Sequence, residues 1–161
     1  MASFDIDIGH GRSICIEATN KCVEFNSYSP IPSGKQVKVS AKSILLDTNA
    51  WKKFNDNIDI IRSNFNDIID NPNSRVEFSL HLGKLIYIRA VSTISCVHIR
   101  KYFLDNKDKV LKPGRPGLAF KLSEFKELLN CVDSINTITE IDSIESCCTA
   151  ETQSECEICN N

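Results

Sequence analysis

The sequence predicts an α+β protein made of two tandem copies of one unit, in which an antiparallel four-stranded sheet is followed by a helix. Three observations predict this fold class. Apolar and polar residues alternate in segments such as CVHIRKYF, from Cys96 to Phe103, which is typical of a strand with one buried face. Apolar residues recur every three or four positions from Trp51 to Ile68, which indicates a helix. The pattern of the first half returns, without gaps, in the second half.

The repeat is defined by one offset of 74 residues, at which Tyr28 meets Tyr102. Matching pairs include Phe4 and Phe78, Gly9 and Gly83, Ile14 and Ile88, Cys22 and Cys96, Lys35 and Lys109, Lys38 and Lys112, and Trp51 and Phe125. We therefore divide the chain into a first copy (1–70), a second copy (75–138) and a tail (139–161). Each copy alone buries little apolar surface, so we expect the two copies to pack on each other.

In the first copy, strands are predicted near residues 4–16, 22–28, 37–39 and 43–46. A helix of about five turns follows, with Asp47 or Thr48 as its N-cap. Its apolar stripe consists of Trp51, Phe54, Ile58, Ile61, Phe65 and Ile68. Pro72 cannot continue a helix, so the segment DNPNSR ends it.

The second copy begins with a strand in which Val76, Phe78, Leu80 and Leu82 alternate with polar residues. After the strand Cys96–Phe103, the segments DNKDK and KPGR supply turns, and LAFKL is a further short strand. The last helix is predicted to start at FKELLNCVDSI, with Ser123 as N-cap and Glu124 and Glu127 in its first turn. We expect Trp51 and Phe125 to be core residues.

Charge is distributed unevenly along the chain. The tail holds six acidic residues and no lysine or arginine, so the net charge of −2 for the whole chain leaves +4 for the first 138 residues. A basic body with an acidic tail is typical of a protein that binds nucleic acid and carries a solvating or regulatory segment. We expect the tail to be disordered or to occupy the basic surface transiently.

Composition and motifs argue against several other classes of protein. No segment has the length of a membrane helix or the layout of a secretory signal, so we expect an intracellular protein with reduced thiols. Four tail cysteines, Cys147, Cys148, Cys156 and Cys159, have poor zinc-ligand spacing, and we expect no metal or other cofactor. No nucleophile, paired carboxylates or phosphate loop is recognisable, so an enzyme is not expected.

The strand Cys96–Phe103 and the segments after it are rich in cations. We expect one face of the sheet to carry Arg100, Lys101, Lys107, Lys109, Lys112 and Arg115, while the other face packs on a helix. Lysine and arginine interleaved with aromatic residues suit a single nucleic-acid strand, because cations contact phosphates and rings stack on bases. Phe103 is the expected stacking residue.

The segment IRKYFLDNKDKVLKPGRPGLAFKLSEFKEL resembles the C-terminal domain of the single-stranded-DNA-binding transcriptional coactivator called positive cofactor four. The resemblance covers about Leu80 to Ile135 and rests on the strand IR(x)Y with an aromatic, an acidic loop, KPGR(x)G and a helix that opens on an aromatic. It implies a curved four-stranded antiparallel sheet, dimerisation through the helices, and a single strand held along the sheet. One chain with two copies would then form an intramolecular pseudo-dimer.

The two copies differ at the positions that the resemblance makes important. The first copy has Asn26, Ser29 and Ala41 where the second has Arg100, Phe103 and Arg115, so binding is expected to be lopsided. The first hairpin of the family has a basic and aromatic tip, of which only Lys21 remains. The expected nucleic-acid-binding residues are Arg100, Phe103, Lys101, Lys107, Lys109, Lys112, Arg115, Lys84, Arg89, Lys38, Lys35, Lys42, Lys21 and Arg12.

The sequence thus predicts a non-enzymatic protein that binds single-stranded DNA, or RNA, in transcription or replication. Its expected location is the nucleus or a viral replication site, and its expected partners are transcription or replication proteins, with self-association as a further mode. The alternative is a structural or interaction protein, for example a viral component, which keeps the fold as a dimerisation scaffold and binds nucleic acid weakly or not at all.

Overall fold

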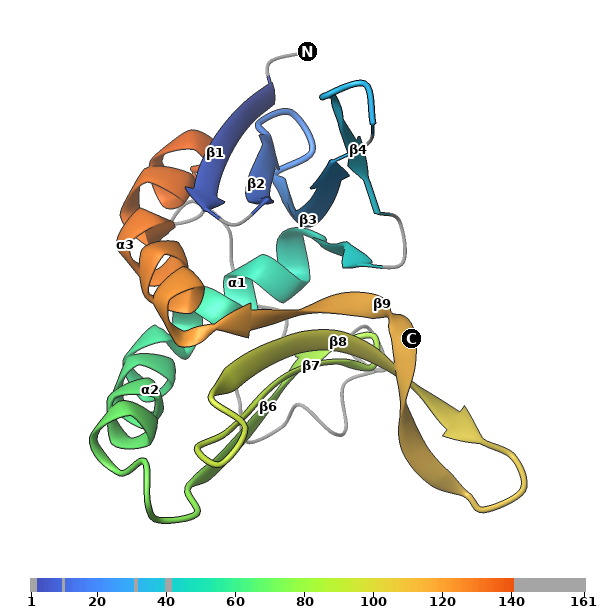
Figure 1. Cartoon of the computed structure of the whole chain (residues 1–161), viewed down its shortest axis with the longest axis vertical. Coiled ribbons are helices and arrows are strands. Elements are labelled where there is room, and N and C mark those ends of the chain that lie inside the picture. The colour runs from blue at the N-terminus through green and yellow to red at the C-terminus, as the bar shows by residue number, and fades with distance from the viewer. Residues whose placement is uncertain (1–2, 10, 31, 40–41, 141–161) are drawn as a thin grey trace.

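The computed structural model describes residues 3–9, 11–30, 32–39 and 42–140 (Figure 1). Over these residues the protein is α+β, with two antiparallel sheets and three helices, which confirms the predicted class. The predicted acidic tail, apart from its first two residues, and its four cysteines lie outside the described residues.

The first sheet has five strands where the sequence predicts four. They are β1 (Ser3–Gly9), β2 (Arg12–Glu17), β3 (Cys22–Pro30), β4 (Gln36–Lys38) and β5 (Ile44–Leu46). The order is β1-β2-β3-β4, and β5 also pairs with β3. The long strand β3 is shared, since its outer end pairs with β4 and its inner end with β5.

The second sheet has the four strands expected, in the order β6-β7-β8-β9. They are β6 (Glu77–Gly83), β7 (Ile86–Val91), β8 (Cys96–Asp105) and β9 (Val110–Lys121). A register shift between Arg100 and Tyr102 interrupts the pairing of β8 with β9. Beyond it the two strands continue as a hairpin that projects from the body (Figure 1).

Strand pairing repeats at the same offset as the sequence. Moving the pairs of the first sheet by 74 residues gives pairs of the second: Phe4↔Ile16 becomes Phe78↔Ala90, Ile14↔Phe25 becomes Ile88↔Ile99, and Val23↔Leu46 becomes Val97↔Phe120. The short strands β4 and β5 take the positions of the two ends of β9. Equivalent residues of the two copies therefore lie on equivalent faces of their sheets.

The first copy has two helices, α1 (Thr48–Asp56) and α2 (Ile58–Asp70), so the expectation of one continuous helix is wrong. The break is at Asn57, whose side-chain amide and backbone N–H both donate to the carbonyl of Lys53, at 2.8 and 3.2 Å. An asparagine can satisfy the backbone in this way and so interrupts a helix. The predicted cap is confirmed, because the Asp47 carboxylate accepts from the N–H of Ala50 at 2.9 Å.

The helix of the second copy, α3 (Leu122–Thr139), starts earlier than predicted. Its N-cap is Lys121, the last residue of β9, and not Ser123. Glu124 accepts a hydrogen bond from the N–H of Lys121 at 2.8 Å, which satisfies this end of the helix without the serine. Glu127 lies beyond the first turn.

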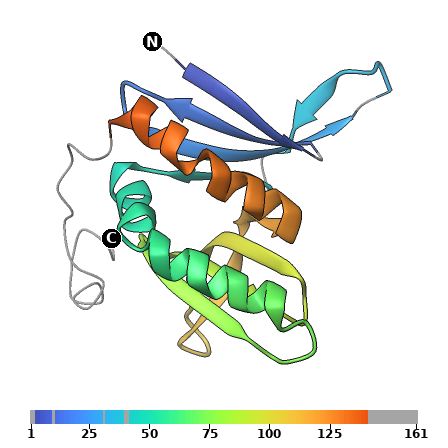
Figure 2. The same cartoon turned by 90° about the vertical axis from the view of Figure 1, so that its left-hand side faces the viewer.

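Each sheet is contacted by the helix of the other copy. The helix α3 packs on β1 and β2 as well as on β8 and β9, while α1 contacts β6 and α2 contacts β7 (Figure 2). Trp51 and Phe125 are both fully buried, as predicted, in one apolar core that includes residues of both sheets. Ring contacts join the two copies, with centroids 5.7 Å apart for Phe25 and Phe120.

Polar bonds also join the helices of the two copies. The indole N–H of Trp51 donates to the Asn136 side-chain oxygen at 3.0 Å, and Arg62 donates to the carbonyl of Leu129 at 3.0 Å. Buried donors of this kind are expensive to leave without a partner, so these bonds help to set how the helices lie against each other.

Candidate nucleic-acid interface

The outer face of the second sheet is polar and cationic. Along β7, Ile86 and Ile88 are buried, so Tyr87 and Arg89 point to the opposite face. Along β8, Val97 and Ile99 are buried, and His98 and Arg100 point outward. The pair Arg89↔His98 in the β7–β8 register confirms that the side chains of these two strands share one face.

This face is hollowed into a groove of about 600 Å³. Its polar lining includes Arg75, Glu77, Arg89, His98, Arg100 and Tyr102, and we call it the cationic groove. Three guanidinium groups face a single carboxylate there, because Glu77 pairs with Arg75 at 2.9 Å. The groove thus keeps a net positive charge, which suits a ligand with several phosphates.

Arg100 is held in the groove by the KPGR segment. Its Nη1 donates to the carbonyl oxygens of Gly114 at 3.0 Å and Arg115 at 3.1 Å. These acceptors are neutral, and a guanidinium has five donors, so Arg100 keeps its charge and further donors for a ligand. Gly114 allows the close approach, since a Cβ there would lie 2.7 Å from the carbonyl oxygen of Lys101.

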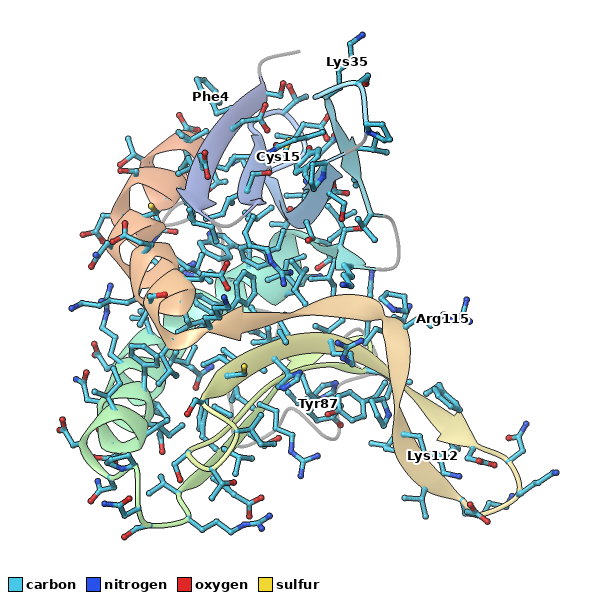
Figure 3. All side chains as sticks on the ribbon, viewed as in Figure 1. Phe4, Cys15, Lys35, Tyr87, Lys112 and Arg115 are labelled. Carbon is cyan, nitrogen blue, oxygen red and sulfur yellow. The ribbon has the colours of Figure 1, made fainter. Side chains whose placement is uncertain are left out.

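Three aromatic side chains form a row across β6, β7 and β8. His81 stacks on Tyr87 with centroids 4.6 Å apart, and Tyr87 meets Tyr102 edge-on at 5.2 Å. Figure 3 labels Tyr87 on the second sheet and Lys112 on the projecting hairpin. Sequence reasoning placed neither tyrosine among the binding residues, although the alternation in LIYIRA and HIRKY puts both on the same side as Arg89 and Arg100.

The two histidines of this face are held neutral near pH 7. Burial, followed by the positive charges of Arg100 and Arg89, lowers the pKa of His98 below its usual value. Burial and then the charge of Lys53 lower the pKa of His81. The positive charge of the groove at neutral pH therefore comes from its arginines.

The structure divides the residues that were expected on one face. Because neighbours along a strand point to opposite faces, Lys101 and Phe103 lie on the reverse side from Arg100 and Tyr102. Phe103 pairs with Lys112 in the hairpin and is 48% exposed. Lys107 and Lys109 are exposed at the tip of the hairpin, and Arg115 is exposed on β9 (Figure 3).

Several predicted cations are paired with carboxylates. Lys112 contacts Asp105 and Asp108 at 2.6 and 2.8 Å. The other ion pairs are Lys84 with Asp47 at 2.7 Å, Lys38 with Glu24 at 2.7 Å, and the mostly buried Arg12 with Glu124 at 3.8 Å. Lys35 and Lys42 are exposed, and Lys21 is half-buried in a turn. Of the predicted set, the cationic groove gathers Arg89 and Arg100, and it adds Arg75.

The equivalent face of the first sheet is not cationic. At the positions of the groove it has Asp7 for His81, Ser13 for Tyr87, Cys15 for Arg89, Glu24 for His98 and Asn26 for Arg100. The same backbone pairing thus presents an acidic surface in one copy and a basic one in the other.

Two other kinds of site were searched for in the part of the chain that is described. Its histidine, cysteine and acidic side chains form no group of three or more that is arranged to hold a metal ion. None of its helices is long and apolar enough to cross a membrane.

No family model, no curated protein and no solved structure matches this chain. The fold and the groove define its class on their own: an α+β protein with an arginine- and tyrosine-lined groove on the outer face of an antiparallel sheet.

Proposed function

We propose that this protein binds single-stranded nucleic acid, DNA in the first place, in the cationic groove. The observation that carries the proposal is the gathering of Arg75, Arg89 and Arg100 with Tyr102 in one groove of a sheet face. Guanidinium groups contact phosphates along the backbone, and aromatic rings stack on bases. Arg100 supports the proposal most directly, because it is held in place by neutral carbonyl groups.

A single strand fits this face better than a duplex. In a duplex the bases are stacked on each other and unavailable to side chains, whereas an open strand offers a ring for each of the groove tyrosines. The proposed activity is binding without catalysis and needs no cofactor. We place it in transcription or replication, in the nucleus or at a viral replication site, with proteins of those processes as partners.

We also infer that the two copies form an intramolecular pseudo-dimer that resembles the dimers of the positive cofactor four family. The common register of the two sheets and the contact of each sheet with the helix of the other copy support this arrangement. A two-fold relation of this kind would place Trp51 and Phe125 at equivalent positions in the shared core.

The second candidate is an interaction scaffold with weak binding of nucleic acid. It is favoured by the ion pairs of Lys38, Lys84 and Lys112, which balance charges that were expected to contact phosphates. The scaffold also accounts for the acidic outer face of the first sheet.

Titration of the full chain with a short labelled oligonucleotide, single-stranded and duplex, separates the two candidates. At about 50 and about 200 mM salt, the single strand should bind more tightly than the duplex, and its affinity should fall with salt. The double variant Arg89→Ala/Arg100→Ala should reduce the magnitude of the salt slope by about 1.4, about 0.7 for each lost phosphate contact.

The matched control is Lys35→Ala/Lys42→Ala, which removes two exposed cations of the first copy and should leave the slope nearly unchanged. Weak and equal binding of the single strand and the duplex, unaffected by loss of Arg89 and Arg100, would favour the scaffold.

A further inference from the structure

The outer face of the first sheet carries a cluster of carboxylates. Because Ile14, Ile16, Val23 and Phe25 point into the core, the residues between them point outward. The acidic side chains of this outward face are Asp5 and Asp7 on β1, Glu17 on β2 and Glu24 on β3, and we call it the acidic face.

A hollow of about 410 Å³ lies on this face. Its lining includes Asp5, Asp7, Ser13, Tyr28 and Gln36. Asp5 and Asp7 are exposed, and Tyr28 contributes the aromatic ring. A hollow with two carboxylates and a ring has the size and chemistry to receive a long cationic side chain.

Asn26 gives independent evidence that this face lacks a ligand group. It is only 2% exposed, and its side-chain oxygen has no hydrogen-bond partner in the described part of the chain. It pairs across the strands with Ser13, which lines the hollow, so the Asn26 side chain lies on the same face. A buried acceptor without a partner is unfavourable, and a donor from outside would satisfy it.

The thiol of Cys15 reports the negative field of the acidic face. Burial raises the pKa of Cys15 to about 11, together with a hydrogen bond to Asp5 and the charges of Asp5 and Glu24. The thiol is therefore neutral and a poor nucleophile at physiological pH. A cation docked on this face would meet carboxylates rather than thiolates.

Two cations of the chain lie near the acidic face, and each already has a carboxylate partner. Lys38 pairs with Glu24 at 2.7 Å, and the Arg12 side chain contacts Glu124 of α3 at 3.8 Å. The Asp7 carboxylate accepts one hydrogen bond, from the N–H of Gly9 at 2.8 Å, and a carboxylate has room for several more. Asp5 and Asp7 thus remain as acceptors at the edge of the hollow.

We propose that the acidic face docks an arginine-bearing segment of another protein. Arginine fits this set of groups better than lysine, because its planar fork pairs with carboxylates, offers further donors for the Asn26 oxygen, and stacks on a ring such as Tyr28. The charge of the face is complementary to such a segment and repels phosphate. The chain would then hold a nucleic-acid strand on one sheet and a basic protein on the other.

A second copy of this chain is a less suitable occupant. The arginines of the cationic groove line a hollow rather than a projection, so they do not reach into the hollow of the acidic face. The projecting hairpin of the second sheet offers lysines, with Asp105 and Asp108 among them.

Nuclear magnetic resonance of the full chain, titrated with an oligo-arginine peptide, tests the proposal. Amide signals of β1, β2 and β3 should shift, and those of β7 and β8 should not. The variant Asp5→Asn/Asp7→Asn should bind the peptide about tenfold more weakly. The matched control Asp67→Asn/Asp70→Asn removes two exposed acids of α2 and should leave the affinity unchanged.

Three results would overturn the proposal. Shifts confined to residues 141–161, or an equal loss of affinity in both variants, would show that the peptide binds through unspecific charge. Equal binding of an oligo-lysine peptide would rule out arginine recognition. Shifts on both sheets when the chain alone is concentrated would show that a second copy occupies the face. Unchanged α3 signals in Asp5→Asn/Asp7→Asn confirm that the variant is folded.

Discussion

At the scale of single residues, Arg100 and Asn26 show how one backbone position acquires two roles. Both occupy the same place in their sheets, one pairing with Gly117 and the other with Ser13. Arg100 reaches the carbonyls of the KPGR segment and stays partly exposed, whereas Asn26 is short and buried. A change of side-chain length at this position is therefore enough to remove a phosphate contact from the first sheet.

The stacking residue of the groove is the first prediction. Tyr102 lines the groove and Phe103 points to the reverse face, so Tyr102→Leu should weaken single-strand binding by about 1–3 kcal/mol with little change in salt slope. Phe103→Ala, although it removes an exposed ring, should have a smaller effect. Fluorescence titration of both variants measures this, and a larger loss from Phe103→Ala would place the strand on the reverse face.

Histidine ionisation is the basis of the second prediction. Because the pKa of His98 is lowered in the folded protein, the unfolded chain binds more protons below about pH 6.5. The free energy of unfolding should therefore be intact above that pH and fall as the pH drops toward about 5. His98→Gln should reduce this dependence. Urea denaturation across this range tests it, and a flat profile in the unmodified protein would contradict it.

At the scale of elements, the apolar patterns predicted strands and helices well, and local hydrogen bonding decided where they end. The stripe from Trp51 to Ile68 is buried as expected, with Ile58 partly buried. The break at Asn57 and the cap at Lys121 depend on which side chain reaches a backbone group first, and neighbouring asparagines and serines look alike in sequence.

The start of α1 gives the third prediction. Asp47 caps this helix and also pairs with Lys84 at 2.7 Å, so Asp47→Ala removes both interactions. We expect a loss of about 1 kcal/mol in the free energy of unfolding, most of it from the cap. Lys84→Ala removes only the exposed ion pair and should cost little. Thermal or urea unfolding of the two variants compares them, and equal losses would show that the ion pair matters more than the cap.

At the scale of the whole molecule, the repeat allowed the arrangement of strands to be predicted, but the binding groove only in part. Arg89 and Arg100 were predicted from the cationic strands, whereas Arg75 precedes β6 and joins the groove only through the pairing of β6 with β7. The ion pair of Lys112 with Asp105 likewise depends on the register of the hairpin. Charges that are far apart in the sequence, or neutralised across strands, are not evident from the sequence alone.

The opposite charges of the two outer faces lead to the last prediction, which concerns stoichiometry. A symmetric pair of sheets would offer two strand sites, but the carboxylates of Asp5, Asp7 and Glu24 repel phosphates from the first sheet. Calorimetric titration with a short single strand should therefore give one site per chain. The variant Asp5→Lys/Asp7→Lys changes exposed positions and should create a second, weaker site at low salt. Two equal sites in the unmodified chain would show that the charge of the first sheet does not control where a strand binds.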